Sequence, residues 1–240
     1  MRWGTAVFAV MVVGATGWTG AQSMTGPDAG PLPPVLETVE TGAAAPGAAH
    51  TAGSAAQRVR LVPAPEGNEV RYRVREQLAN IEFPSDAIGA TGAVAGAIVV
   101  EDDGTVVKEE SRFVVNLTGL TSDTQMRDRY IQRNTLQTAD SANMNAVFAP
   151  TGLSGLTLPL PASGSLSFRV TGDFTVHGTT RPTTWDVTAE PTAQGVRGTA
   201  KTAFTFEEFG LTKPRVARVL SVVDTIRLEY DFNLVRDPAR

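Results

Sequence analysis

The chain has 240 residues, with 21 Lys and Arg against 25 Asp and Glu and a net charge of −4. This mildly acidic balance argues against nucleic-acid binding, which needs a basic surface. With no cysteine and two histidines, disulfides, thiol chemistry and a His-rich metal site are excluded.

Residues 1–21 have the pattern of a secretory signal. Arg2 supplies the positive charge, an apolar run follows over Ala6–Ala15, and the small residues Thr19–Ala21 form a cleavage site. The apolar run is shorter than the about 20 residues of a transmembrane helix. We therefore expect an exported protein, periplasmic or extracellular, with an uncleaved N-terminal anchor as the alternative.

Residues 22–57 are rich in Pro, Gly, Ala and Thr and contain few large apolar side chains. Such a segment buries too little surface to offset its ordering entropy, so we predict a disordered linker. His50, one of the two histidines, falls here and is expected to be inert. The folded domain is expected over residues 58–240, which is long enough to be stabilised by its core alone.

Beyond the linker, apolar and polar residues alternate with a period of two, which is typical of strands with one dry and one wet face. The longest alternation runs over Ser165–His177 and ends in a turn at Gly178–Pro182. The other apolar positions are, in chain order, Val70, Tyr72 and Val74; Val94, Gly96, Ile98 and Val100; Phe113, Val115 and Leu117; Ala146–Phe148; Trp185 and Val187; Val196, Ala200, Phe204 and Phe206; and Ile226, Leu228, Tyr230, Phe232 and Leu234.

About eight such strands predict an all-β fold, a closed antiparallel barrel. One segment, Thr121–Thr138, breaks the period and predicts a short helix that caps the barrel, with Ser122 or Asp123 as its N-cap. The apolar residues on one face of this helix are Met126, Tyr130, Ile131 and Leu136.

Catalytic patterns are not found in the sequence. Ser154 lies in Gly152–Gly155, which does not match the Gly-x-Ser-x-Gly nucleophile elbow, and no phosphate loop occurs. The carboxylates of Glu109 and Glu110, like those of Glu207 and Glu208, would face opposite sides of a strand. We expect no enzymatic activity, no catalytic residue, no metal and no cofactor.

His177 ends the longest strand on its polar face. The favoured interpretation is structural, a hairpin in which Gly178 adopts a positive φ. The alternative is a hydrogen-bond donor to the head group of a ligand.

Arg71, Arg73 and Arg75 form a basic stripe on the outer face of one strand. The favoured interpretation is a solvated surface. The alternative is peripheral contact with a membrane through anionic lipid head groups.

The dry faces gather most of the large aromatic residues, whereas Gly96, Gly172, Gly198 and Ala200 are expected to leave space among them. The interior of an eight-stranded barrel is either filled by side chains or holds one small ligand. An apolar slot suits a hydrophobic ligand. The alternation alone does not distinguish a pocket from a filled core.

The segment Val170–Val187 resembles the signature of the YceI-like family, Gly-Asp-Leu-Thr-(Ile/Val)-His-Gly-Val-Thr-(Lys/Arg)-Pro-Val-Thr. It matches over Gly172–Thr184, with Phe174 and Thr179 in place of the usual Leu and Val. The resemblance extends over about Glu69–Val235. Further matches are Arg127, Asp128 and Leu136, and then Phe206, Phe209, Gly210 and Leu211.

This resemblance implies a lipocalin-like barrel, exported and non-catalytic, that holds a long isoprenoid or other amphiphile in an apolar pore. The family-motif turn comprises His177, Gly178, Thr180 and Pro182. The predicted pore wall comprises Val94, Ile98, Phe113, Val115, Phe168, Val170, Phe174, Trp185, Phe204, Phe206, Leu228 and Tyr230.

The leading hypothesis is therefore a secreted or periplasmic binding protein that carries or sequesters an isoprenoid or quinone-like lipid. The alternative is an envelope interaction module with a filled barrel and no physiological small ligand. Thr135–Asn145 departs from the family pattern and leaves the identity of the lipid open. Val74–Gly89 lacks a strand period and is expected to form the mouth of the pore.

Overall fold

The computed structural model of the chain describes residues 58–79, 82–158 and 160–237. The signal segment expected over residues 1–21 and the linker expected over residues 22–57 lie outside the described residues. All of the described residues belong to one compact unit.

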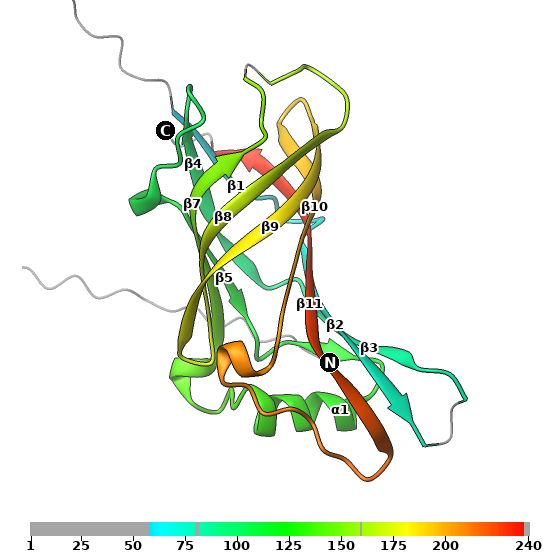
Figure 1. Cartoon of the computed structure of the whole chain (residues 1–240). Coiled ribbons are helices and arrows are strands. Elements are labelled where there is room, and N and C mark those ends of the chain that lie inside the picture. The colour runs from blue at the N-terminus through cyan, green and yellow to red at the C-terminus, as the bar shows by residue number, and fades with distance from the viewer. Residues whose placement is uncertain (1–57, 80–81, 159, 238–240) are drawn as a thin grey trace, which may run out of the picture. The chain divides into compact units, whose positions relative to one another are not determined.

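Eleven strands of the described chain form one antiparallel sheet (Figure 1). Their bounds are β1 Arg58–Pro63, β2 Glu69–Leu78, β3 Ser85–Thr91, β4 Val94–Glu101, β5 Arg112–Asn116, β6 Thr121–Ser122, β7 Asn145–Ser154, β8 Leu166–Val176, β9 Thr179–Pro191, β10 Gly195–Phe204 and β11 Val219–Arg236.

The sheet closes on itself. Strands β1, β4, β5, β7, β8, β9, β10 and β11 follow one another around a ring, and β11 pairs back onto β1 from Leu61–Arg236 to Pro63–Leu234. The predicted closed antiparallel barrel of about eight strands is thereby confirmed. Closure matters for function, because a closed sheet has one continuous inner face.

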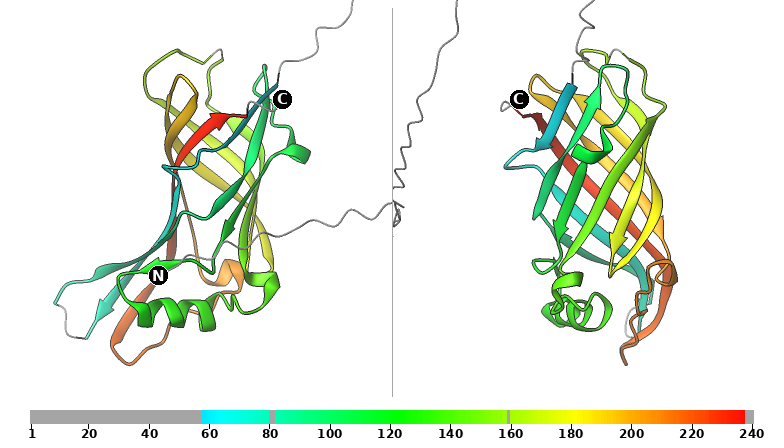
Figure 2. Two further views of the ribbon diagram at one scale, coloured as in Figure 1. Left: turned by 180° about the vertical axis from the view of Figure 1, so that it is seen from behind. Right: turned by 90° about the vertical axis from the view of Figure 1, so that its left-hand side faces the viewer.

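The ring carries a branch at β11, whose 18 residues pair with β10 along one edge and with two strands, β1 and β2, along the other. Its C-terminal end pairs with β1, whereas its earlier part pairs with β2, from Val219–Leu78 to Asp231–Glu69. β2 continues into β3 and then β6. The β2–β3 hairpin and the start of β11 protrude at the end of the barrel where α1 lies (Figures 1 and 2).

The predicted helix is present but short. α1 spans Gln125–Tyr130 and continues into a π-helical turn, Ile131–Thr135. Both predicted N-caps are wrong, because the cap residue is Thr124 and it makes no side-chain capping bond. The Ser122 hydroxyl instead donates to Asp128 at 2.6 Å. The predicted apolar face is also wrong at Met126, whose side chain is 77% exposed.

Three short 3₁₀ segments complete the described secondary structure: Lys108–Glu110, Ser141–Asn143 and Glu207–Phe209. In the described ranges, no helix has both the length and the apolar character needed to cross a membrane. Phe206, predicted as the last apolar position of a strand, lies beyond β10 at the start of the third 3₁₀ segment, where it is buried.

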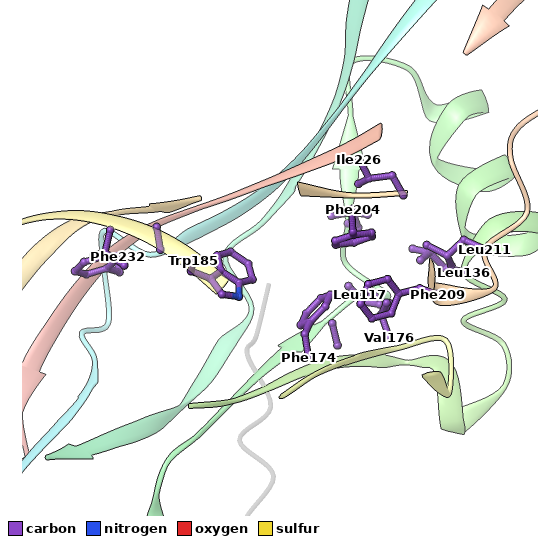
Figure 3. Packing of buried hydrophobic residues seen from close by; sticks show 14 of the residues in the cluster. Leu117, Leu136, Phe174, Val176, Trp185, Phe204, Phe209, Leu211, Ile226 and Phe232 are labelled. Carbon is purple, nitrogen blue, oxygen red and sulfur yellow. The ribbon is translucent and has the colours of Figure 1, made fainter. Parts of the chain in front are cut away.

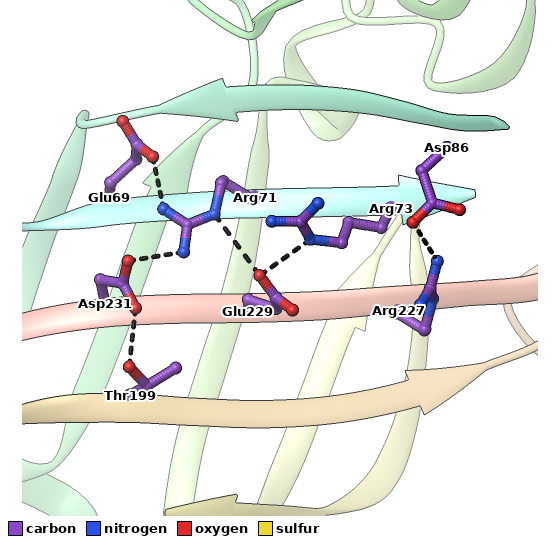
Figure 4. A network of polar contacts seen from close by, with 8 residues as sticks. All are labelled: Glu69, Arg71, Arg73, Asp86, Thr199, Arg227, Glu229 and Asp231. Carbon is purple, nitrogen blue, oxygen red and sulfur yellow. Dashed lines mark hydrogen bonds and ion pairs between the residues drawn. The ribbon is translucent and has the colours of Figure 1, made fainter. Parts of the chain in front are cut away.

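The basic stripe lies on the outer face of β2, where carboxylates compensate its charge (Figure 4). Burial opposes ionisation of Glu229, but the hydrogen bond from Arg73 and the positive charges of Arg73, Lys201 and Arg71 together hold the pKa of that carboxyl below its usual value. The stripe thus links β2 to its neighbours and offers little free charge to anionic lipid. The ion pairs are Arg71–Glu69 (2.6 Å), Arg71–Asp231 (2.5 Å), Arg71–Glu229 (3.5 Å), Arg73–Glu229 (3.0 Å) and Arg75–Asp86 (3.4 Å).

Candidate functional site

The inner face of the ring encloses a cavity of about 910 Å³. This volume lies near the upper end of the roughly 300–1,000 Å³ found for ligand pockets. Every strand of the ring contributes to its wall, and β2 and β3 extend that wall toward α1. The side chains on this wall are overwhelmingly apolar, because alternate residues of each strand point inward.

All twelve residues predicted for the pore wall line this cavity. Phe168, Val170 and Leu228 point inward and yet remain partly exposed, because they face open space and not other side chains. This residual exposure distinguishes a cavity wall from a packed core. That these residues contact a ligand remains a prediction.

Part of the predicted wall is packed core (Figure 3). Phe174 stacks edge-on against Trp185 and Phe209, with ring centroids 6.1 and 5.5 Å apart. Phe204 lies 4.5 Å from Phe209 by the same measure, and all four rings are buried. This aromatic cluster packs beside the 3₁₀ segment Glu207–Phe209, and its members Phe174, Trp185 and Phe204 also border the cavity.

The glycines do not create the open space in the way the sequence suggested. A Cβ at Gly172 would lie 2.7 Å from the ring of Phe148, and one at Gly198 would lie 2.8 Å from the ring of Phe232. Aromatic rings therefore occupy the room that these glycines provide. Gly96 is exposed at φ +126°, and a Cβ there would collide with a backbone carbonyl, so its predicted interior position is wrong.

One polar cluster interrupts the apolar wall, next to α1. The Arg127 guanidinium donates to the Glu76 carboxylate at 2.8 Å and also pairs with Asp123. Burial opposes the charge on Arg127, but these two carboxylates outweigh it and raise its pKa above the ordinary value. Burial also raises the pKa of Tyr72, which lines the same stretch of wall, to about 12. The cluster is thus satisfied internally.

The second buried phenol on the wall is Tyr230. Its hydroxyl donates to the Asn68 side chain at 2.8 Å, and burial raises its pKa. Asn68 in turn donates to the Ala64 carbonyl at 2.8 Å. The hydroxyl therefore fixes the ring of Tyr230, and the ring presents its apolar surface to the cavity.

The cavity wall reaches both ends of the barrel. At the end beside α1 it includes Met126, Val216 and Arg218, which we name the helical mouth. At the other end it includes Glu101, Leu158 and Leu160, which we name the distal mouth. Leu158 and Leu160 lie in the connection between β7 and β8.

The family-motif turn lies off the cavity wall, since His177, Gly178, Thr180 and Pro182 do not line it. His177 and Gly178 have φ values of 51° and 70° and form the tight connection from β8 to β9. The Thr175 and Thr180 hydroxyls hydrogen-bond across this turn at 2.8 Å. This geometry supports the structural interpretation of the motif.

Two features of the wall were not assigned to it from the sequence. The ion pair of Glu76 with Arg127 was missed because only the tertiary fold brings β2 against α1. Leu156, Leu158 and Leu160 of the β7–β8 connection also line the cavity, and their period-two spacing was a usable signal. In the described ranges, no cluster of three or more His, Asp or Glu side chains could hold a metal ion.

The comparisons with known proteins agree with this architecture. A family model described as "YceI-like domain" matches residues 64–234. A search of curated protein sequences gives no match.

Two solved structures share the fold. A polyisoprenoid-binding domain from Saccharophagus degradans, implicated in plant cell wall breakdown, superposes with a TM-score of 0.57 at 9% identity, covering 75% of this chain and 100% of that one. The Campylobacter jejuni YceI protein superposes with a TM-score of 0.51 at 13% identity, covering 67% of this chain and 90% of that one. Because the family model spans most of the chain, this protein belongs to the YceI-like domain family.

Proposed function

We propose that this domain binds an elongated apolar lipid, isoprenoid or quinone-like, inside the barrel and holds it without chemical change. The observation that carries the proposal is the apolar cavity of about 910 Å³ that reaches both ends of the ring. The polyisoprenoid binding named for the Saccharophagus degradans domain of the same fold supports the choice of ligand class.

The driving force would be removal of the lipid chain from water. Each methylene buried contributes about 0.8 kcal/mol, so a chain several isoprene units long offsets the cost of association. The wall offers little to recognise a charged group, because Arg127 is already paired with Glu76 and Asp123. A long apolar chain therefore fits the wall better than a short polar ligand.

The cavity also favours this function over the alternative of a filled-barrel interaction module. A filled barrel would bring inward side chains into mutual contact at the density of a protein core. Here Phe168, Val170 and Leu228 keep exposed surface on the inner face. The proposal places the protein outside the cytoplasm, as the N-terminal sequence predicts, where it would carry or sequester the lipid.

A pair of substitutions on β8 tests the proposal. Val170 faces the cavity, whereas Ser167 faces solvent on the same strand. Val170→Trp should fill part of the cavity and abolish uptake of a long-chain isoprenoid quinone, measured as quinone that co-elutes with the full chain in gel filtration. Ser167→Trp should take up quinone like the wild type. Equal uptake by a folded Val170→Trp variant would exclude the cavity as the binding site.

A further inference from the structure

Exposed apolar side chains gather around the helical mouth. Of the seven large hydrophobic residues exposed in the described chain, five lie at this end and two at the distal mouth. We name the five the apolar rim. Its members are Phe83 (71% exposed), Met126 (77%), Val216 (41%), Leu220 (66%) and Val223 (49%).

Strand pairing and hydrogen bonds bring the segments that carry the apolar rim together. Leu78, at the end of β2, pairs in register with Val219, and the Ala79 backbone N–H donates to the Arg218 carbonyl at 2.9 Å. The Arg215 backbone N–H donates to the Tyr130 hydroxyl of α1 at 3.3 Å. The β2–β3 hairpin and the approach to β11 project past α1 on the same side (Figures 1 and 2).

The apolar rim is continuous with the interior. Met126 and Val216 are exposed to solvent and also line the cavity. A soluble protein rarely exposes large apolar side chains in a cluster unless something covers them. If the hydrocarbon of a lipid bilayer covered this mouth, it would be in direct contact with the apolar wall of the cavity.

The charges beside the apolar rim indicate what kind of surface could cover it. The segment from residue 212 to residue 218 carries Lys213, Arg215 and Arg218 and no acidic residue. None of these three cations forms an ion pair within the described ranges. The acidic residues Glu82 and Asp224 lie next to Phe83 and Val223 of the apolar rim, outside this segment. The positive charge is therefore concentrated on residues 212–218 at the helical mouth. The apolar rim beside unpaired cations suits the interface of an anionic bilayer, where apolar side chains enter the lipid and cations contact the phosphates.

We propose that the helical mouth docks on membranes that contain anionic phospholipid. The apolar rim enters the interface, and Lys213, Arg215 and Arg218 contact the lipid phosphates. The cavity would then open toward hydrocarbon and not toward water, a role in lipid transfer that rests on the proposed function. Docking here replaces the Arg71–Arg75 stripe as the membrane contact, because carboxylates already pair with that stripe.

The absence of cysteine from the chain allows a local test. Leu220→Cys at the rim and Leu158→Cys at the distal mouth each give one labelling site for a polarity-sensitive dye on the full chain. The dye at position 220 should shift to the blue with phosphatidylcholine–phosphatidylglycerol vesicles and not with phosphatidylcholine alone. The dye at position 158 should not respond. A local dye also excludes binding through Ala6–Ala15 as the cause of the signal.

The cations are tested in the Leu220→Cys background. Changing Lys213, Arg215 and Arg218 to Gln should weaken the vesicle response by roughly fivefold for each charge removed. No response at position 220, an equal response at position 158, or an unchanged response in the Gln variant would overturn the proposal. A shift that depends on protein concentration without vesicles would instead assign the rim to contact between copies of this chain.

These results separate the two proposals. If quinone uptake is normal but the dye at position 220 does not respond to vesicles, only the docking proposal is overturned. A vesicle response in a chain that takes up no quinone would leave docking in place and overturn the proposed cargo. Phe83→Ser combined with the labelled Leu220→Cys should reduce the vesicle response without changing quinone uptake, because Phe83 does not line the cavity.

Discussion

Substitution of Arg127 by Met would test how the helical mouth is held together. The guanidinium reaches Glu76 at 2.8 Å, and the Glu76 side chain is only 9% exposed. Its removal leaves a buried carboxylate without its cationic partner. Loss of one partner from a fully buried pair costs about 3–5 kcal/mol. Because Arg127 keeps 20% exposure, we expect a smaller loss of unfolding free energy, about 2–3 kcal/mol.

The assay is urea unfolding of the full chain, followed by circular dichroism, within a double-mutant cycle that includes Glu76→Gln. The double variant should be nearly as stable as Glu76→Gln alone, because no buried charge remains. The matched control is Arg169→Met, whose pair with Asp186 is exposed on both sides and should not measurably shift the midpoint. Equal effects of the two Met variants, or strict additivity in the cycle, would refute the buried-pair account.

The remaining predictions concern packing and ionisation. Phe209→Ala should cost about 3–5 kcal/mol, since this ring is 1% exposed in the aromatic cluster. Phe83 is 71% exposed, so Phe83→Ala should lower the free energy of unfolding by less than about 0.5 kcal/mol. Similar thermal midpoints for Phe209→Ala and Phe83→Ala would contradict the buried packing of Phe209. Gly172→Ala should lose about 1–3 kcal/mol, because its Cβ would lie 2.4 Å from a carbonyl oxygen, whereas Gly119→Ala meets nothing closer than 3.8 Å and should be neutral in urea unfolding. Burial raises the pKa of Tyr72 from 10.0 to about 12, because it disfavours the ionised phenolate. The contribution of the neutral phenol to the free energy of unfolding should therefore be complete below pH 10 and lost by pH 12. A tyrosinate absorbance titration in which Tyr72→Phe removes no late-titrating group would contradict this.

The inward face was predictable because β-strands present alternate residues to alternate sides. Phe168 and Val170 on β8, like Leu228 and Tyr230 on β11, follow this rule without interruption, and all four line the cavity. The rule fails where the backbone leaves regular strand geometry. Gly96 has a positive φ and is exposed, whereas the alternation of the strand predicted that it faces the interior.

The ends of the barrel were harder to predict than its wall. Met126 fits an apolar helical stripe, yet the structure leaves it 77% exposed on α1, where it borders the cavity at the helical mouth. Val74–Gly89 was expected to be irregular, whereas most of it forms the β2–β3 hairpin. Neither the branch at β11 nor the Glu76–Arg127 pair has a local sequence signal, because both depend on contacts between distant segments.

The contents of the cavity test the central claim most directly. The full chain would be purified without detergent and extracted with organic solvent, and the extract analysed by mass spectrometry beside extracts of Val170→Trp and Ser167→Trp. We predict a stoichiometric isoprenoid or quinone-like lipid from the wild type and Ser167→Trp, and its loss from Val170→Trp. An extract without lipid, from a wild-type chain that also takes up no added quinone, would contradict the account and favour a barrel that functions through its surface.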